Sequence, residues 1–488
     1  MGLTRGSWTF VLAAVAAIGG GCGGGGGSGG SDNTFTPQPS PDCSPPTSPT
    51  VSAAAAVAGP ATDPGVCVEQ VASSSLPSAR VIHLGQLPVN TRVAFDVPDK
   101  TGSFTIVLQK VTASTGDVTF AGTQAFRNTP VPLKITAPDG SAFYDDTSVP
   151  LDFTKANAVH FPGQSGTGAF TVPNTSHTLS AWQRGVPTGH WTFVVGDYAA
   201  ECADLGPSGC TSGADTSGVY DVTVLLRPGP LPTTGTIDVS FYLASTTYQA
   251  STAGTDPGLA RMVATFNSIF ANAGICLNKV TFVDVPAWAR TKYAAGVDVS
   301  RTGPCDDLSQ LFTLSQPDSD IHIFLVDDIL QNGGGGLLTV GIDGAIPGPS
   351  SIGGTIVSGA VVNDANVEHG VGTSACGATP DFSACGPDRT ALVVAHETGH
   401  WLGLYHTTER NGGVFDPVSD TGTCPCAQCA PQQNLAACST PLALVTQTDC
   451  SKGASCSGAN NLMFWEVGSE ATLSPQQAQI MRGNPAVR

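Results

Sequence analysis

The stretch His396-Glu397-Thr398-Gly399-His400-Trp401-Leu402-Gly403-Leu404-Tyr405-His406 has the pattern H-E-x-x-H-x-x-G-x-x-H. His396 and His400 are four residues apart, so on a helix they lie on one face, one turn apart. His406 can join them only if the chain turns, because ten further helical residues would carry it about 15 Å along the axis. Gly403 can adopt the positive φ that ends a helix. The pattern therefore predicts a helix from about 388 to 403, followed by a turn that returns His406.

The residues before the motif support a buried helix. Residues 391 to 395 are apolar throughout, and Asp388 stands where an N-cap would lie, directly after Gly386 and Pro387. Three converging imidazoles can bind Zn²⁺ and leave its fourth position open for water, as a catalytic zinc requires. Glu397 is close enough to reach such a water without being placed as a ligand.

A second motif lies downstream. The segment Asn461-Leu462-Met463-Phe464-Trp465 places one of only four methionines of the chain after the histidine motif. It resembles the Met-turn of the metzincin zinc proteases. Within that clan, three segments are similar in sequence to the pappalysin-like (cytophagalysin) family: His400 to Thr407, Asp416 to Thr421 and Leu473 to Arg482. The resemblance covers about residues 236 to 485.

This sequence departs from the family pattern at two places. Thr408 stands where relatives carry an aromatic residue, and Phe464-Trp465 stands where their Met-turn continues Asp-Tyr. Trp465 has an N–H donor but cannot bind zinc, so the departure removes any role of a tyrosine at this point. The three-histidine site is unaffected.

The resemblance implies a zinc-dependent endopeptidase acting on proteins or peptides. In this reading His396, His400 and His406 bind zinc, Glu397 is the general base, and Met463 packs beneath the metal. The alternative is a surface-tethered binding or adhesion protein in which the zinc is structural, but a structural site has no use for Glu397. A third reading is a latent zymogen in which the thiol of Cys43 or Cys67 occupies the open position of the zinc.

The resemblance also implies structural calcium between the third histidine and the Met-turn. Asp416 and Asp420 supply hard oxygen ligands at a suitable spacing. A solvated turn is the competing reading of these two residues.

The composition indicates exported, β-rich and loop-rich domains. Only 12% of the residues are charged, while glycine occurs 59 times and proline 36 times. The net charge of −18 argues against nucleic acid as a partner, since no basic patch could neutralise phosphates. The charge does not identify a substrate, and the oligomeric state stays open.

The N-terminus has the pattern of an export signal over residues 1–22. Arg5 is followed by an apolar stretch from Trp8 to Ile18 and by small residues before Cys22. The stretch is too short to span a bilayer permanently. Cys22 followed by Gly-rich sequence resembles a bacterial lipoprotein, so we expect cleavage and lipidation of Cys22 and a place in the cell envelope. Gly19 stands where a leucine is expected, so ordinary cleavage and release from the cell is the alternative. A lipid anchor would be the protein's contact with a membrane.

The chain has 15 cysteines, and removing Cys22 leaves an even number, which suits disulfides in an oxidising compartment. Local spacing predicts the pairs Cys202–Cys210, Cys276–Cys305 and Cys376–Cys385. A cluster follows the zinc helix: Cys424, Cys426, Cys429, Cys438, Cys450 and Cys456. We expect disulfides in this cluster, with a structural zinc at Cys424, Cys426 and Cys429 as the alternative.

The sequence predicts a multidomain protein. Residues 23–65 are rich in Gly, Ser and Pro and are interpreted as a tether. Residues 66–226 contain short Val-, Phe- and Thr-rich runs without a helical period, which predicts an all-β sandwich or jelly roll. This accessory domain could be a pro-region, a targeting module or a spacer. Residues 227–235 form a proline-rich linker.

Residues 236–488 are expected to form an α+β metzincin-type catalytic domain with a twisted mixed sheet and an irregular, disulfide-rich C-terminal subdomain. Strands are predicted at 236–243, 280–283, 321–326 and 354–362, and an apolar stripe predicts a helix over 257–273. The strand nearest the zinc helix should be the sheet edge that pairs with substrate. We therefore assign substrate binding to Thr355, Ile356 and Val357.

Overall fold

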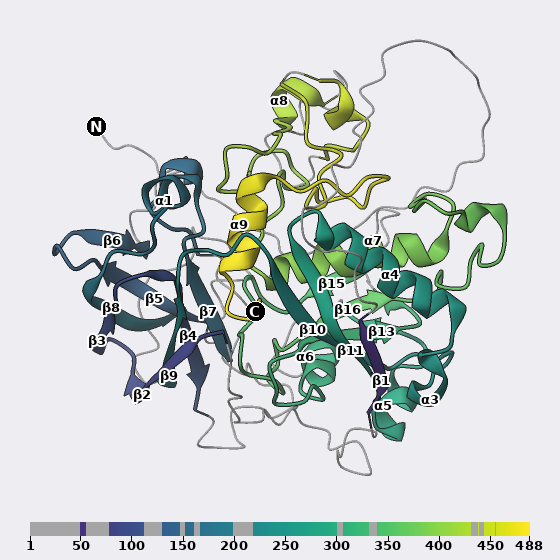
Figure 1. The fold of residues 1–488 in the computed structure, drawn as a ribbon, viewed down its shortest axis with the longest axis horizontal. Coiled ribbons are helices and arrows are strands. Elements are labelled where there is room, and N and C mark those ends of the chain that lie inside the picture. Colours follow the sequence, from purple (N-terminus) through teal and green to yellow (C-terminus); the bar gives the residue numbers. More distant parts are fainter. Residues whose placement is uncertain are drawn as a thin grey trace.

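Figure 1 shows the computed structural model, which describes residues 49–54, 78–111, 129–146, 152–160, 166–198, 218–299, 306–330, 339–430, 438, 444–453 and 455–488. The chain is a mixed α/β molecule with several sheets. A β-rich part and a part built on a six-stranded sheet lie side by side, and the yellow C-terminal helix lies between them (Figure 1).

The β-rich part is a sandwich of two antiparallel four-stranded sheets. One sheet has the order β2 (Arg80–Pro88), β9 (Val219–Pro228), β4 (Thr101–Lys110), β7 (Thr167–Val172). The other has the order β3 (Arg92–Val97), β8 (Gly189–Tyr198), β5 (Thr129–Thr136), β6 (Ala142–Asp145). Buried aromatic rings fill the space between the sheets, as in the edge-to-face contact of Phe104 with Trp191 at 5.3 Å.

The predicted β-sandwich is thus present, with one departure. A short helix, α1 (Ser176–Ala181), interrupts a region in which the sequence shows no helical period. Thr175 caps it by accepting a hydrogen bond from the backbone N–H of Thr178 at 3.3 Å. Six residues are too few for a hydrophobic period to show.

The second part is built on a mixed sheet of order β1-β11-β10-β13-β16-β15. Its strands are β1 (Thr50–Ala53), β11 (Ile275–Asp284), β10 (Gly235–Leu243), β13 (Ile321–Val326), β16 (Ala360–Asn363) and β15 (Gly341–Asp343). Neighbours are parallel except β15, which is antiparallel to β16. Helices α4 (Pro257–Ala271) and α7 (Gly386–Trp401) share one apolar core with this sheet. The predicted strand at 321–326 and the helix at 257 are confirmed.

Smaller elements complete this part. They are α3 (Ala250–Ala253), α5 (Ala287–Lys292), α6 (Asp307–Phe312), β12 (Val297–Asp298), β14 (Ile329–Leu330), α8 (Cys426–Cys429) and α9 (Pro475–Gly483), with 3₁₀ turns at Phe153–Lys155, Ser374–Cys376 and Asp449–Ser451. A second apolar core on the opposite face of the sheet includes residues of α5 and α6.

The first strand of the sheet corrects one expectation. Residues 50–53 were expected within the tether, but they form β1, which pairs in parallel with β11 at the sheet edge. All four side chains are exposed, so no hydrophobic alternation marks the strand in the sequence. The linker is also shorter than predicted, because Arg227 and Pro228 belong to β9 and Gly235 belongs to β10.

The two parts contact one another closely. Ile352 packs against Val107, Ala169 and Leu225 on the outer face of the first sandwich sheet. The hydroxyl of Ser103 donates to the carbonyl of Gly483, and the buried guanidinium of Arg227 donates to the carbonyls of Asn484 and Val487. The sandwich is therefore joined to the C-terminal segment by apolar and polar contacts.

Disulfides stabilise the segment after α7. Cys424–Cys450, Cys426–Cys438 and Cys429–Cys456 are paired, so disulfides replace the alternative of a structural zinc. The predicted bond Cys376–Cys385 is present. Cys276 is disulfide-bonded, whereas Cys305 and the predicted pair Cys202–Cys210 lie outside the described residues. Such bonds are typical of exported proteins.

Among the residues that the structure describes, no helix has the length and apolar character needed to cross a membrane.

Candidate metal centre

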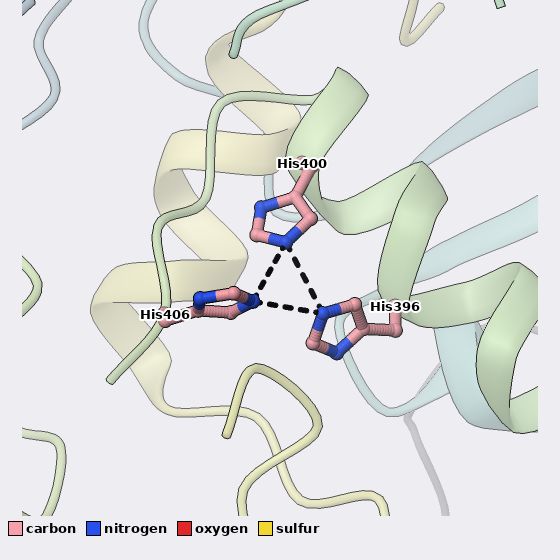
Figure 2. Close-up of side chains that lie close together, drawn as sticks. All are labelled: His396, His400 and His406. Carbon is pink, nitrogen blue, oxygen red and sulfur yellow. Dashed lines mark hydrogen bonds between the residues drawn. The ribbon is translucent and has the colours of Figure 1, made fainter. Parts of the chain in front are cut away.

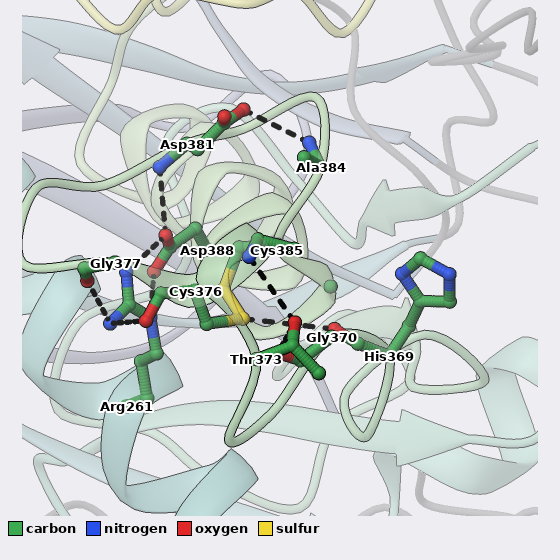
Figure 3. Close-up of a disulfide and its surroundings, with 12 residues drawn as sticks. Arg261, His369, Gly370, Thr373, Cys376, Gly377, Asp381, Ala384, Cys385 and Asp388 are labelled. Atoms are coloured by element: carbon green, nitrogen blue, oxygen red, sulfur yellow. Dashed lines mark hydrogen bonds and ion pairs between the residues drawn. A yellow bond between two sulfur atoms is a disulfide. The ribbon is translucent and has the colours of Figure 1, made fainter.

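Helix α7 carries the first two histidines and begins two residues before the predicted N-cap. Cys385 occupies the N-cap position, and Asp388 lies inside the first turn instead. The fully buried carboxylate of Asp388 accepts hydrogen bonds from Arg261 Nε at 2.8 Å and Nη2 at 2.7 Å, and from Thr265 Oγ1 at 2.7 Å. Figure 3 shows how Arg261 and the Cys376–Cys385 disulfide surround the start of the helix. Asp388 therefore fixes helix α7 to α4.

The three histidines converge as their spacing predicts (Figure 2). Gly403 has φ 104° and ends the helix, which lets the chain return His406. The Nε2 atoms of His396, His400 and His406 lie 3.1 to 3.2 Å from one another. Tetrahedral coordination at about 2.0–2.1 Å places neighbouring nitrogens about 3.3 Å apart. The triangle therefore fits a zinc ion.

The outer nitrogen of each ring has its own partner. Nδ1 of His396 lies 2.7 Å from the carbonyl of Leu462, and Nδ1 of His400 lies 2.7 Å from the carbonyl of Leu404. Nδ1 of His406 faces the carboxylate of Glu409. A proton on each Nδ1 leaves the Nε2 lone pairs free for the metal.

Burial also favours the neutral form of His396 and His400. It lowers the pKa of His396 to about 3, with a further contribution from His406. Burial and the neighbouring histidines place the pKa of His400 well below its usual value. Neutral imidazole is the form that binds metal, so the site is ready for zinc at neutral pH.

Met463 forms the floor of the site, as the Met-turn resemblance implies. Its side chain is fully buried, and its carbonyl accepts a hydrogen bond from the backbone N–H of Thr407 at 2.9 Å. A Cβ atom at Gly399 would lie 2.6 Å from its sulfur. Glycine at 399 therefore lets the methionine approach the zinc helix. Trp465 instead donates to the carbonyl of Val445 inside the disulfide-rich segment.

Glu397 is buried beside strand β15. A Cβ atom at Gly341 would lie 2.4 Å from Glu397 Oε1, so only glycine lets the strand lie this close. Burial raises the pKa of Glu397 to about 8, and the backbone N–H of Asp343 opposes that rise. Oε2 has no hydrogen-bond partner among the described residues. One oxygen is thus held by β15 and the other is free to act.

Two residues near the site carry no sequence pattern that singles them out. The carboxyl of Asp343 is buried close to Glu397, and burial together with that charge raises the pKa of Asp343 far above its usual value. Glu409 follows the third histidine and contacts its ring. A carboxylate three residues after a metal-binding histidine is the one signal that could have drawn attention to Glu409.

The predicted substrate strand is wrong in its position. Thr355, Ile356 and Val357 are buried in a turn, and β16 begins only at Ala360. The hydroxyls of Thr355 and Ser358 lie 2.6 Å apart, and that of Ser358 accepts from the backbone N–H of Thr355. Such bonds compete with a strand ladder. Moreover β16 lies between β13 and β15, so the sheet edge beside Glu397 is β15.

The two aspartates predicted to bind calcium lie in different surroundings. Asp420 accepts hydrogen bonds from the Ser474 hydroxyl and the Gln476 backbone N–H at the start of α9. Asp416 is buried and bonds to Thr421 through one oxygen, while the other has no partner among the described residues. Among the described residues, His396, His400 and His406 form the one group of three potential metal ligands that lie close together. Calcium here stays a prediction, and Cys22 lies outside the described residues.

Comparison with known proteins gives a distant result. No protein-family model matches this sequence, and no curated protein matches it. Among solved structures, metalloproteinase-II from Bacteroides fragilis matches with a TM-score of 0.20 and 12% identity over 41% of this chain. The match spans 58% of that metalloproteinase. The assignment of the site therefore depends on its own geometry.

Proposed function

We propose that this protein is a zinc-dependent endopeptidase of the metzincin type. The observation that carries the proposal is the convergence of three buried imidazoles beside the buried carboxyl of Glu397. His396, His400 and His406 would bind the zinc. The finer resemblance to pappalysin-like enzymes rests on the quoted sequence motifs.

The metal site and Glu397 have separate roles in the proposed peptide hydrolysis. Bound zinc would supply Lewis acidity toward a water molecule and toward the scissile carbonyl. The charge of bound zinc would favour the ionised form of Glu397, which accepts a proton from the attacking water as the new C–O bond forms. Glu397 then delivers that proton to the leaving nitrogen as the C–N bond breaks. Atoms and charge balance without a further reactant.

Strand β15 is suited to hold the substrate. Among the described residues it is the last strand of the sheet, and it lies against Glu397, so an extended peptide could add to its outer edge. Protein or peptide substrates are the class that we propose for this edge. Export, anchoring through Cys22 and calcium at Asp416 belong to the same proposal and rest on the sequence.

The alternative is an exported binding protein with a structural metal. Glu397 argues against it, because a structural site closes its coordination shell and needs no buried carboxyl with a free oxygen. The proposal therefore predicts turnover and not only metal binding.

The test is cleavage of casein by the full chain loaded with zinc. We expect the wild type to cleave, chelation to stop it, and Glu397→Ala to lose nearly all activity while keeping one zinc per chain. Glu470→Ala, at an exposed position, is the matched control. Stoichiometric zinc without cleavage, before and after limited trypsin treatment, would overturn the proposal and favour the binding protein.

A further inference from the structure

Three polar residues lie one or two positions beyond the ends of three adjacent parallel strands. Ser245 follows β10, Asp327 follows β13 and Asp364 follows β16. The registers of β10 with β13 and of β13 with β16 place these residues in one row across the sheet. The carboxyl edge of a parallel sheet is where such sheets bind ligands.

The row faces the same side of the sheet. Leu243, Leu325 and Val362 lie two residues before its members and are all buried in the core under α4 and α7. Because side chains alternate along a strand, residues two positions later point to that same face. The two carboxylates therefore meet on one side.

Asp327 already has a full set of donors. Ser245 Oγ donates to its Oδ1 at 2.7 Å, and Thr246 donates to its Oδ2 through the backbone N–H at 2.9 Å and the hydroxyl at 2.8 Å. Burial opposes ionisation, but these bonds prevail and lower the pKa of Asp327. Asp327 is therefore a fixed negative charge.

Asp364 has less compensation than Asp327. Its side chain is 3% exposed, and Oδ2 has no hydrogen-bond partner among the described residues. Ser245 has a single hydroxyl proton, which it gives to Asp327. Burial raises the pKa of Asp364 to about 7; contact with Ser245 lowers this pKa and the charge of Asp327 adds to the rise. A buried carboxylate beside another one is costly unless a positive charge balances it.

We propose that Asp364, Asp327 and Ser245 bind a calcium ion at this edge of the sheet. Carboxylate and hydroxyl oxygens are hard ligands, and calcium accepts an irregular shell completed by main-chain carbonyls and water. Two carboxylates match its charge. The ion would join the ends of β10, β13 and β16 and so fix the turn that leads from β16 toward the zinc helix.

The test is calcium content and thermal stability of the zinc-loaded full chain, dialysed against calcium or against a calcium-selective chelator. Asp364→Asn should bind one calcium fewer per chain than the wild type and lose that part of the calcium-dependent rise in Tm. Glu470→Gln is the control, because this carboxylate is exposed and lies outside the row. Ser245→Ala, which removes a neutral ligand, should weaken calcium binding about tenfold, a loss of about 1.4 kcal/mol.

Equal calcium content in the wild type and Asp364→Asn would overturn the proposal. If Asp364→Asn does not fold, the calcium affinity of Ser245→Ala decides, and unchanged affinity rejects the site. Neither readout depends on protease activity, so failure here is distinct from failure of the proposed function.

Discussion

Nδ1 of His406 lies 3.2 Å from Oε1 of Glu409, on the side of the ring that faces away from the other histidines. The other two rings use backbone carbonyls for the same purpose. A carboxylate raises the basicity of the imidazole and fixes its tautomer. His406 is outside the helix, so its ring depends on this contact for its orientation.

Glu409→Gln should therefore weaken zinc binding by about 10–100-fold, because the amide carries no charge. Zinc affinity is measured by competition with a chromogenic chelator. Glu470→Gln is the control. Equal affinities in the wild type and Glu409→Gln would show that Glu409 does not support the ring.

Gly341→Ala should reduce casein cleavage by about tenfold or more and retain zinc. The new Cβ would lie 2.4 Å from Glu397 Oε1 and 2.7 Å from Val393 Cγ1, so either the carboxylate or the strand must move. A small displacement of a catalytic group is costly in rate. The measurement is kcat/KM with zinc content determined in parallel. Gly413→Ala, whose Cβ would meet only the Asn411 side chain, is the control. Full activity of Gly341→Ala would show that the position of Glu397 does not depend on close contact with β15.

Gly386→Ala should destabilise the fold by about 1–3 kcal/mol, the range for overpacked sites. The added Cβ would lie 1.7 Å from the backbone oxygen of Asn366, which cannot yield as a side chain can. Urea unfolding of the variant gives the difference in stability. Gly377→Ala is the comparison, because its nearest neighbour would be at 3.7 Å. Similar midpoints for the two variants would refute this account.

Calcium-free protein should lose stability as the pH rises, through Asp416. Burial raises its folded pKa to about 8 from the usual 3.8. A raised carboxyl pKa stabilises the fold below the unfolded value, and that contribution disappears as the pH rises through the folded value. Urea midpoints at about pH 5 and about pH 9 test this, with Asp416→Asn expected to show a smaller difference. Equal differences would assign the pH dependence to other groups.

The sequence predicted the elements that are marked by period or motif. The strand at 321–326 is buried and contains several β-branched residues. The predicted bounds of α7 lie within two residues of the observed ones at each end. The apolar stripe of α4 was equally visible because the helix spans 15 residues. These features arise from local spacing, which a single sequence contains.

Other features depend on contacts between distant segments. Glycine at 341 is required by Glu397, which is far away in the chain. The turn at 355–357 forms because Thr and Ser hydroxyls bond locally, although the residue types also suit a strand. The row of Ser245, Asp327 and Asp364 exists only once three strands are aligned.

Strand β1 has a consequence for the architecture of the chain. It precedes the sandwich in sequence, yet it pairs with β11 in the six-stranded sheet against which α7 packs. The sandwich is therefore an insertion between two strands of one sheet, not an appendage at its start. A pull on the N-terminal segment would load the edge of that sheet directly, without passing through the sandwich.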